Sequence, residues 1–288
     1  MVADPLRIDS RRWPLFLAIF GCLSILFAPP PRSALAADPW MCVETAGQII
    51  TLTVPSQVYH KPVASSVYMP PCYDWTPGQL PVIYLLHGGN ADETQWPDLR
   101  VRQEADALIA QGAAPFVVVM PGGYYGVGLD YATFVLNDLI PAIEGRLRVR
   151  ADGAGRAIGG ISLGGYWALQ VAFQHPDLFA AVGGHSPVTT RTGGPDDPLS
   201  LAATAPGLDR LLITLDAGNL DSLRASTVQL AGALNARGLA VALSISPGSH
   251  NRPYWRSHTA DYLRFYLDAI ESIPSSKPCA HARYPEEP

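Results

Sequence analysis

Positive charge is scarce in this chain and does not gather into a run. Lys and Arg number 20 against 25 Asp and Glu, which leaves a formal net charge of −5, and little of the positive charge comes from lysine. A protein that binds nucleic acid normally carries a basic patch or stripe, and polybasic attachment to a membrane surface requires clustered Lys or Arg. The composition therefore argues against both kinds of partner.

Cysteine is rare as well, and the sequence contains no internal repeat. The chain has 288 residues and 4 cysteines. Without a targeting segment roughly 250 residues would remain, which suits one large domain that buries its core without metal or disulfide staples. We therefore expect a single folded domain.

The N-terminus has the pattern of a segment removed during export. Arg11 and Arg12 precede an apolar run at 14–28, and small residues follow up to Ala36. This order is typical of a secretory signal peptide, which we place at 1–36, and the apolar run is short for a membrane span. The protein is therefore expected to be secreted or extracytoplasmic; the alternative is an uncleaved N-terminal anchor.

Export favours a disulfide among the cysteines that remain after cleavage. Cys42 and Cys72 flank the first two strand-like segments, so we expect a bridge between them that pins the N-terminal edge. Cys279 would then be a free thiol. The alternative is that all three are reduced.

Strand-like and helix-like segments alternate through the rest of the chain. Alternation predicts an α/β fold with a mostly parallel sheet and helices on both faces, in which the first two strands are antiparallel additions. We expect an N-terminal extension at 37–47, the folded domain at 48–272, a disordered tail at 273–288 and a surface loop at 191–207. Expected strands are 48–54, 63–69, 82–86, 116–120, 156–159, 179–183, 211–215 and 240–245, and expected helices are 99–111, 131–147 with a kink at Pro141, 165–173, 225–237 and 259–270.

Residues 160–164 have the form Gly-x-Ser-x-Gly and lie between a strand-like run and a helix-like run. A nucleophile elbow requires this context, because the serine sits on a strained turn and flanking glycines let neighbouring main chain approach without a Cβ clash. The pattern alone also occurs in turns without chemistry. With a strand before it and a helix after it, Ser162 is predicted to be a nucleophile.

A serine hydroxyl needs a base, and the base needs an orienting acid. In hydrolases with this elbow, the acid and then the histidine follow the serine along the chain. The acid is expected just after the strand at 211–215, where Asp216 and Asp221 compete. Asp221 follows a glycine-containing turn and can reach back toward a histidine, so we expect Asp221; the other would be an ordinary turn or helix-cap acid.

The base is expected after the strand at 240–245. His250 follows a Pro-Gly turn there and is the predicted base. Its rival His258 would start the final helix and face away. His87 and His185 also follow strands on the same rim of the sheet, and we expect them to support the pocket.

Two amide donors are needed to hold the oxyanion of a tetrahedral intermediate. One is expected to be the N–H of Leu163, directly after the serine. The other is expected from the loop at 87–90, where Gly89 is preferred over Gly88. The alternative is that this glycine pair only makes a tight turn.

These motifs together resemble the putative-esterase family of α/β-hydrolases, which includes S-formylglutathione hydrolases, enterochelin and feruloyl esterases and mycobacterial mycolyltransferases. The resemblance spans roughly 49–270. Leu163 stands where many members have Met. The residues that carry the resemblance are Pro70-Pro71-Cys72-Tyr73, 81–89, Trp96, 138–141, 155–165, 167–169, 216–218 with Asp221, and Gly248 with His250 and Trp255.

The resemblance implies a secreted serine carboxylesterase with Ser162, Asp221 and His250 as its triad and Gly89 and Leu163 as its oxyanion hole. It implies no metal or cofactor and a small-molecule or carbohydrate ester as the partner, with membrane contact only if the N-terminal segment stays attached. An acyltransferase that moves an acyl group to a sugar or alcohol is an alternative, although nothing resembles the lid or trehalose-binding elements of the mycolyltransferases. A non-catalytic binding scaffold is another. Candidate pocket residues are His87, Tyr124, Trp167 and Trp255.

Overall fold

The computed structural model describes residues 42–123 and 130–273. The expected signal peptide at 1–36, Tyr124 and Cys279 lie outside the described residues. Within the two described ranges, no helix combines the length and the apolar character needed to cross a membrane.

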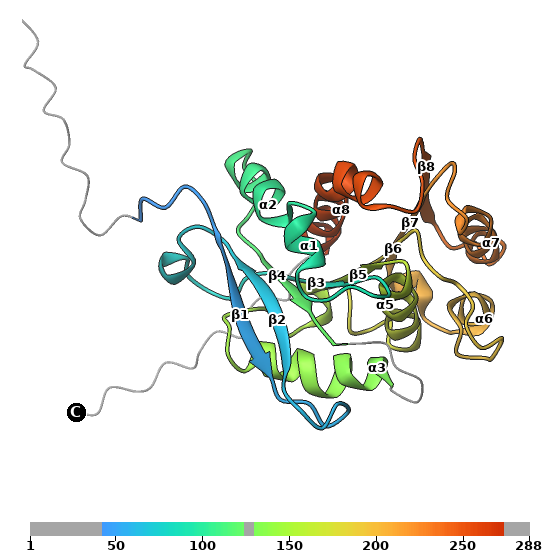
Figure 1. Ribbon diagram of the computed structural model, residues 1–288, viewed down its shortest axis with the longest axis horizontal. Coiled ribbons are helices and arrows are strands. Elements are labelled where there is room, and N and C mark those ends of the chain that lie inside the picture. Colours follow the sequence, from blue (N-terminus) through green and yellow to red (C-terminus); the bar gives the residue numbers. More distant parts are fainter. Residues whose placement is uncertain (1–41, 124–129, 274–288) are drawn as a thin grey trace, which may run out of the picture. The chain divides into compact units, whose positions relative to one another are not determined.

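The described strands form one eight-stranded sheet in the order β1-β2-β4-β3-β5-β6-β7-β8 (Figure 1). Strand β2 pairs antiparallel with both β1 and β4, and the remaining pairs are parallel. The predicted α/β class and antiparallel N-terminal strands are confirmed. The strands are β1 (Gln48–Val54), β2 (Val63–Met69), β3 (Val82–Leu86), β4 (Val117–Pro121), β5 (Arg156–Ile161), β6 (Ala181–His185), β7 (Leu212–Gly218) and β8 (Val241–Ser246).

A hydrophobic core lies on each face of the sheet. Along β3, Val82, Tyr84 and Leu86 join one core, whereas Ile83 and Leu85 join the other, and all five are buried. A strand covered on both faces is expected to be apolar throughout, as β3 is. Helices α3 to α7 cover the first core and α1, α2 and α8 cover the second (Figure 1). The helical segments are η1 (Tyr73–Trp75), α1 (Gln95–Asp98), α2 (Val101–Ala110), α3 (Tyr131–Thr133), η2 (Phe134–Leu139), α4 (Ile140–Glu144), η3 (Gly153–Gly155), α5 (Leu163–Gln174), α6 (Pro198–Thr204), η4 (Leu208–Arg210), α7 (Arg224–Asn235) and α8 (Arg252–Ser272).

The last helix is longer than the sequence predicted. It begins at Arg252 rather than at Thr259. The Asn251 side chain accepts a hydrogen bond from the Tyr254 N–H at 3.1 Å and so caps the helix. Pro253 falls in the first turn, where a missing N–H leaves no partner unsatisfied. The capped first turn therefore extends the helix toward His250.

Two other segments differ from prediction. The predicted helix at 131–147 is confirmed only in part, because the π-helical turn η2 separates α3 from α4. Pro141 follows η2, and its ring would clash with the carbonyl four residues earlier in a regular α-helix, so the wider turn relieves that clash. The predicted loop at 191–207 is wrong over α6, which begins after Asp197 with Pro198 in its first turn.

The predicted disulfide between Cys42 and Cys72 is confirmed. It ties the start of the described chain to the residues after β2. The Glu44 carboxylate also accepts a hydrogen bond from the Cys72 N–H at 2.7 Å. The covalent bond and this contact together fix the N-terminal edge of the sheet.

Loss of this disulfide is expected to lower stability. The bridge closes a loop with a sequence separation of 30, and removing such a constraint on the unfolded chain costs about 2–4 kcal/mol. The double variant Cys42→Ser/Cys72→Ser should therefore melt at a lower temperature than wild type in thermal denaturation. Adding reductant should lower the melting temperature of wild type but not of the variant; a wild type insensitive to reductant would contradict this.

Candidate active site

Ser162 lies on a strained turn between β5 and α5. Its φ is 56° and its ψ is −113°, values that side-chain-bearing residues rarely adopt. Such strain costs on the order of 1–3 kcal/mol and persists only where surrounding contacts enforce it. The side chain of Ser162 is half-buried, so its hydroxyl remains within reach of solvent.

Glycines let main chain pack directly against main chain at this turn. A Cβ on Gly164 would lie 2.3 Å from the His87 carbonyl oxygen and 2.5 Å from that of Leu86, and a Cβ on Gly160 would lie 2.3 Å from the Gly164 carbonyl carbon. The end of β3 therefore touches the start of α5. This contact brings the loop after β3 beside Ser162.

The loop after β6 holds the peptide of Ser162 from the other side. The Ser162 N–H donates to the His185 carbonyl oxygen at 2.9 Å, and the Val188 N–H donates to the Ser162 carbonyl oxygen at 3.0 Å. Both contacts oppose relaxation of the strained φ.

A chain of hydrogen bonds leads from Ser162 to an acid. The Ser162 Oγ lies 2.9 Å from His250 Nε2, and His250 Nδ1 lies 2.9 Å from Asp221 Oδ2 and 3.2 Å from Oδ1. The Asp221 side chain is fully buried, whereas 29% of the His250 side chain is exposed. The structure thus brings the three residues expected from the sequence into one line.

The loops that carry Asp221 and His250 are hydrogen-bonded to each other. The Asn219 side chain accepts a hydrogen bond from the Gly248 N–H at 3.1 Å, the Leu220 N–H donates to the Gly248 carbonyl at 2.8 Å, and the Asn219 N–H donates to the Ser246 carbonyl at 2.8 Å. These bonds continue the parallel pairing of β7 and β8 beyond the strands. The acid loop and the histidine loop therefore keep a fixed spacing.

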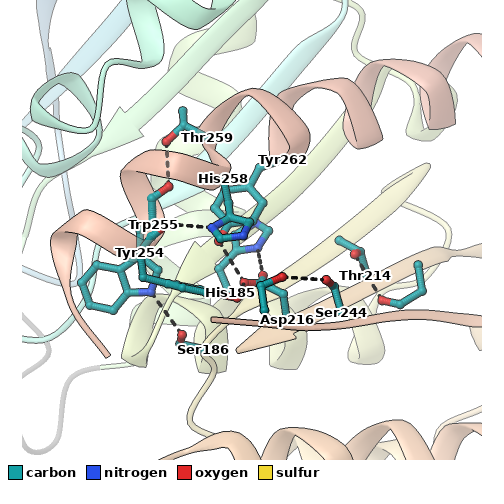
Figure 2. A network of polar contacts seen from close by, with 12 residues as sticks. His185, Ser186, Thr214, Asp216, Ser244, Tyr254, Trp255, His258, Thr259 and Tyr262 are labelled. Carbon is teal, nitrogen blue, oxygen red and sulfur yellow. Dashed lines mark hydrogen bonds and ion pairs between the residues drawn. The ribbon is translucent and has the colours of Figure 1, made fainter. Parts of the chain in front are cut away.

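The competing acid, Asp216, belongs to a second and fully enclosed His–Asp pair (Figure 2). Its Oδ1 accepts from His185 Nδ1 at 2.7 Å, and its Oδ2 accepts from the hydroxyls of Tyr254 and Tyr262 at 2.8 and 2.9 Å. His185 Nε2 lies 2.8 Å from the Tyr266 hydroxyl, and the His185 side chain has no exposed surface. Neither His185 nor Asp216 contacts Ser162 through its side chain.

Burial raises the pKa of the Tyr262 and Tyr266 phenols well above their ordinary value, and the nearby Asp216 carboxylate raises it further. Both phenols therefore remain protonated. The Tyr262 hydroxyl can then serve as a permanent donor to Asp216.

The two amides expected to hold an oxyanion differ from the Gly88 amide in their hydrogen bonding. In the part of the chain that the structure describes, the N–H groups of Gly89 and Leu163 make no hydrogen bond. The Gly88 N–H, by contrast, donates to the Gln95 Oε1 at 2.7 Å. A Cβ on Gly89 would lie 3.8 Å from Leu163 Cδ2, so the two segments are neighbours.

The expected pocket residues do not share one environment. His87 is buried, with Nδ1 2.7 Å from the Gly88 carbonyl and Nε2 2.8 Å from the Gly123 carbonyl, and burial lowers its pKa. Trp167 lies under the guanidinium of Arg191, with 5.3 Å from Cζ to the ring centroid. Trp255 packs against the ring of His250, and Tyr124 lies outside the described residues.

Sequence reasoning missed the partners of the buried pair. Tyr254, Tyr262 and Tyr266 recur at intervals of eight and four residues, a spacing that puts them on one face of α8 and could have indicated a shared partner. Ser186, which accepts from the Trp255 indole, left no sequence signal. His258 lies inside α8 rather than at its start, with Nδ1 2.7 Å from the Tyr254 carbonyl oxygen.

Among the described residues, Cys42, Glu44 and Cys72 form a cluster with the spacing of metal ligands. The disulfide occupies both sulfur atoms. The cluster therefore offers no thiolate to a metal ion.

A family model described as "Putative esterase" matches residues 56–266. The chain belongs to this esterase family. Among curated esterase relatives, one from Mycobacterium tuberculosis is 33% identical over 132 residues, which is 42% of this chain and 28% of that protein. An endo-1,4-beta-xylanase/feruloyl esterase of Xylanibacter ruminicola is 31% identical over 152 residues, 46% of this chain and 20% of that protein. The chain thus spans less than a third of the length of these relatives.

Solved structures share the α/β-hydrolase fold of this esterase-family chain. A ferulic acid esterase superposes with a TM-score of 0.73 at 24% identity, covering 78% of this chain and 99% of that one. An S-formylglutathione hydrolase of Staphylococcus aureus superposes with a TM-score of 0.68 at 19% identity, covering 77% and 99%. At these identities the likeness concerns the fold.

Replacing Gly164 by alanine is expected to destabilise the elbow. The new Cβ would lie 2.3 Å from a main-chain oxygen that cannot rotate away, and overpacking of this kind costs about 1–3 kcal/mol or more. Urea denaturation of Gly164→Ala should show this loss. Gly232→Ala is the matched control, because nothing lies within 4 Å of its Cβ in α7 and alanine should add about 0.5–1 kcal/mol there. Equal stability of Gly164→Ala and wild type would contradict the contact.

Stability is expected to fall in alkali because of the buried tyrosines. Phenols of the unfolded chain lose protons near pH 10, whereas the raised pKa of Tyr262 keeps its phenol protonated in the folded state. Unfolding therefore releases a proton above pH 10, and each such group lowers stability by about 1.4 kcal/mol per pH unit as pH rises toward the folded-state pKa. Chemical denaturation from pH 8 to 11 should show a shallower decline in Tyr262→Phe than in wild type. Identical declines of stability with pH in Tyr262→Phe and wild type would mean that Tyr262 does not contribute to the loss of stability in alkali.

Proposed function

We propose that this protein is a secreted serine carboxylesterase that hydrolyses its substrate through an acyl-enzyme. The proposal rests above all on the line of contacts from the half-exposed Ser162 through His250 to the buried Asp221. A nucleophile, a base within hydrogen-bond reach and a third group that orients the base are the parts needed for nucleophilic acyl transfer.

Acylation begins at the Ser162 hydroxyl. Its Oγ attacks the ester carbonyl carbon while its proton passes to His250 Nε2, 2.9 Å away. Asp221 accepts a hydrogen bond from the Nδ1–H of His250 and so keeps the Nε2 lone pair directed at Ser162. The positive charge that forms on the imidazole is stabilised by this buried carboxylate.

The carbonyl oxygen becomes an oxyanion in the tetrahedral intermediate. The amides of Gly89 and Leu163 are proposed to donate to it, since neither has a hydrogen-bond partner among the described residues, whereas the Gly88 amide donates to Gln95. Leu163 also begins α5, so the positive end of the helix dipole adds to the stabilisation.

Collapse of the intermediate releases the alcohol and leaves the acyl group on Ser162. His250 returns its proton to the leaving oxygen. A water molecule then attacks the acyl-enzyme with His250 again as base, and the acid product leaves. Each proton exchange runs through Nε2 of the same histidine.

The substrate is proposed to be a small-molecule or carbohydrate ester of an aromatic acid. Feruloyl esterases with sinapinate or ferulic acid bound have the same fold as this chain. Export would bring the enzyme to extracellular esters, and the disulfide between Cys42 and Cys72 is consistent with an oxidising compartment.

Variants of the serine and of the two aspartates test the proposal. Ser162→Ala should abolish hydrolysis of both p-nitrophenyl acetate and methyl ferulate, and a fluorophosphonate should label wild type but not this variant. Asp221→Asn should lower kcat by a factor on the order of 10²–10⁴, because the amide favours the wrong histidine tautomer. Asp216→Asn is the matched control at the enclosed pair. It should clearly lower the free energy of unfolding while changing kcat much less than Asp221→Asn does.

The outcomes separate the possible functions. Retained ester hydrolysis in Ser162→Ala would refute the proposed nucleophile. Failure of the fluorophosphonate to label folded wild type would favour a binding scaffold over an enzyme. A larger loss of kcat in Asp216→Asn than in Asp221→Asn would transfer the role of acid to Asp216.

A further inference from the structure

An indole ring lies against the imidazole of His250. Trp255 follows His250 by five residues, at the start of α8, and the two ring centroids are 5.0 Å apart with planes at 87°. Trp255 is 7% exposed, so the indole is packed inside while the histidine reaches the surface. His250 thus meets a large and immobile neighbour on one side.

The indole is itself anchored by a hydrogen bond. Trp255 Nε1 donates to Ser186 Oγ at 3.1 Å (Figure 2). Ser186 is fully buried, and its own N–H donates to the Asp216 carbonyl oxygen at 2.7 Å. Because Ser186 is shielded from solvent, water cannot take its place as the acceptor for the indole N–H. The hydrogen bond to Ser186 therefore favours one position of the indole.

The segment that anchors Trp255 also holds the nucleophile. In the segment 185–188, the His185 carbonyl accepts a hydrogen bond from the Ser162 N–H, and the Val188 N–H donates to the Ser162 carbonyl. Ser186 lies between these two contacts. The nucleophile and the indole that packs on the base are therefore held by the same four residues.

The need for such support follows from the chemistry. His250 is fixed at Nδ1 by Asp221 throughout, but its Nε2 must release Ser162, protonate a leaving group and then accept a proton from water. During these steps the ring is held by one nitrogen alone, and a displacement of about 1 Å can cost on the order of 10²-fold in rate.

We propose that Trp255, anchored on Ser186, is a positioning residue that keeps the His250 ring aligned with Ser162 while Nε2 changes partners. The inference rests on the proposed function, since it assumes that Ser162 and His250 react. Trp255 acts through His250 and need not touch the substrate.

Graded variants test the two links separately. Trp255→Leu removes the ring and should lower kcat for p-nitrophenyl acetate about 10- to 100-fold with KM little changed. Trp255→Phe keeps an aromatic ring beside His250 but loses the N–H, and Ser186→Ala loses only the hydroxyl. Each should lower kcat by a smaller factor. Because both remove the same hydrogen bond, the double variant Ser186→Ala/Trp255→Phe should be no slower than the worse single variant.

A spectroscopic readout separates positioning from loss of stability. The Nδ1 proton that His250 shares with Asp221 should give a far-downfield proton resonance in wild type. This resonance should persist in Trp255→Phe and should broaden or disappear in Trp255→Leu. Phe116→Leu is the control. Phe116 is fully buried just before β4, at the amino-terminal ends of the parallel strands, whereas Ser162 follows the carboxyl end of β5. This change should lower stability but leave kcat and the resonance unchanged.

Contrary results would overturn the proposal in distinct ways. A Trp255→Leu variant that raises KM at unchanged kcat would make Trp255 a wall of the substrate pocket. A loss of kcat in Phe116→Leu as large as that in Trp255→Leu would mean that reduced stability alone explains the loss. If the losses of kcat in Ser186→Ala and Trp255→Phe multiplied in the double variant, Ser186 would not act through Trp255. If Ser162→Ala kept its activity, the proposed function would fail first; if Ser162→Ala were inactive and Trp255→Leu kept wild-type kcat, only the positioning role would fail.

Discussion

Main chain packed directly on main chain around Ser162 sets the geometry of the whole site. Gly164 touches the carbonyls at the end of β3, so α5 starts closer to the sheet than any side chain would permit. This contact puts the loop with Gly89 next to Leu163, beside the turn where Ser162 has a φ of 56°. Hydrogen bonds from 185–188 to the peptide of Ser162 hold that strain. Because Ser162 cannot relax, every other group of the candidate site is placed relative to it.

The chain contains two His–Asp pairs, and their surroundings give them different capacities. In the pair of His185 and Asp216, both ring nitrogens have partners and the histidine has no exposed surface, so it has no access to a substrate. In the pair of His250 and Asp221, the carboxylate is equally buried but Nε2 faces the Ser162 hydroxyl. The enclosed pair joins β6, β7 and α8, whereas the open pair is hydrogen-bonded to the Ser162 hydroxyl. The same chemical pair thus serves as structure in one place and is proposed for catalysis in the other.

Local sequence predicted the strands better than the helices. Strands β1, β2 and β3 have the predicted limits, because short β-branched or apolar runs are bounded there by prolines and polar residues. The predicted and observed helices differ at α6 and at the start of α8. Pro198 and Pro253 lie in the first turns of these helices, where the missing N–H costs nothing, so a proline there does not exclude a helix. Pro141 widens its helix into a π-helical turn, a response that propensity alone does not specify.

The sequence by itself determined the strand–Ser162–helix unit, the order of acid and histidine after it and membership of the esterase family, because these depend on neighbours in the chain and on motif spacing. Only the tertiary structure decided that Asp221 and not Asp216 meets His250, and that Trp255 is tied to Ser186. It also decided that, within 42–123 and 130–273, the Gly88 amide has a hydrogen-bond partner and the Gly89 amide has none. Each of those choices is between chemically similar groups a few residues apart. Burial and hydrogen-bond partners supplied by distant strands resolve them, and no local pattern records which strands will become neighbours.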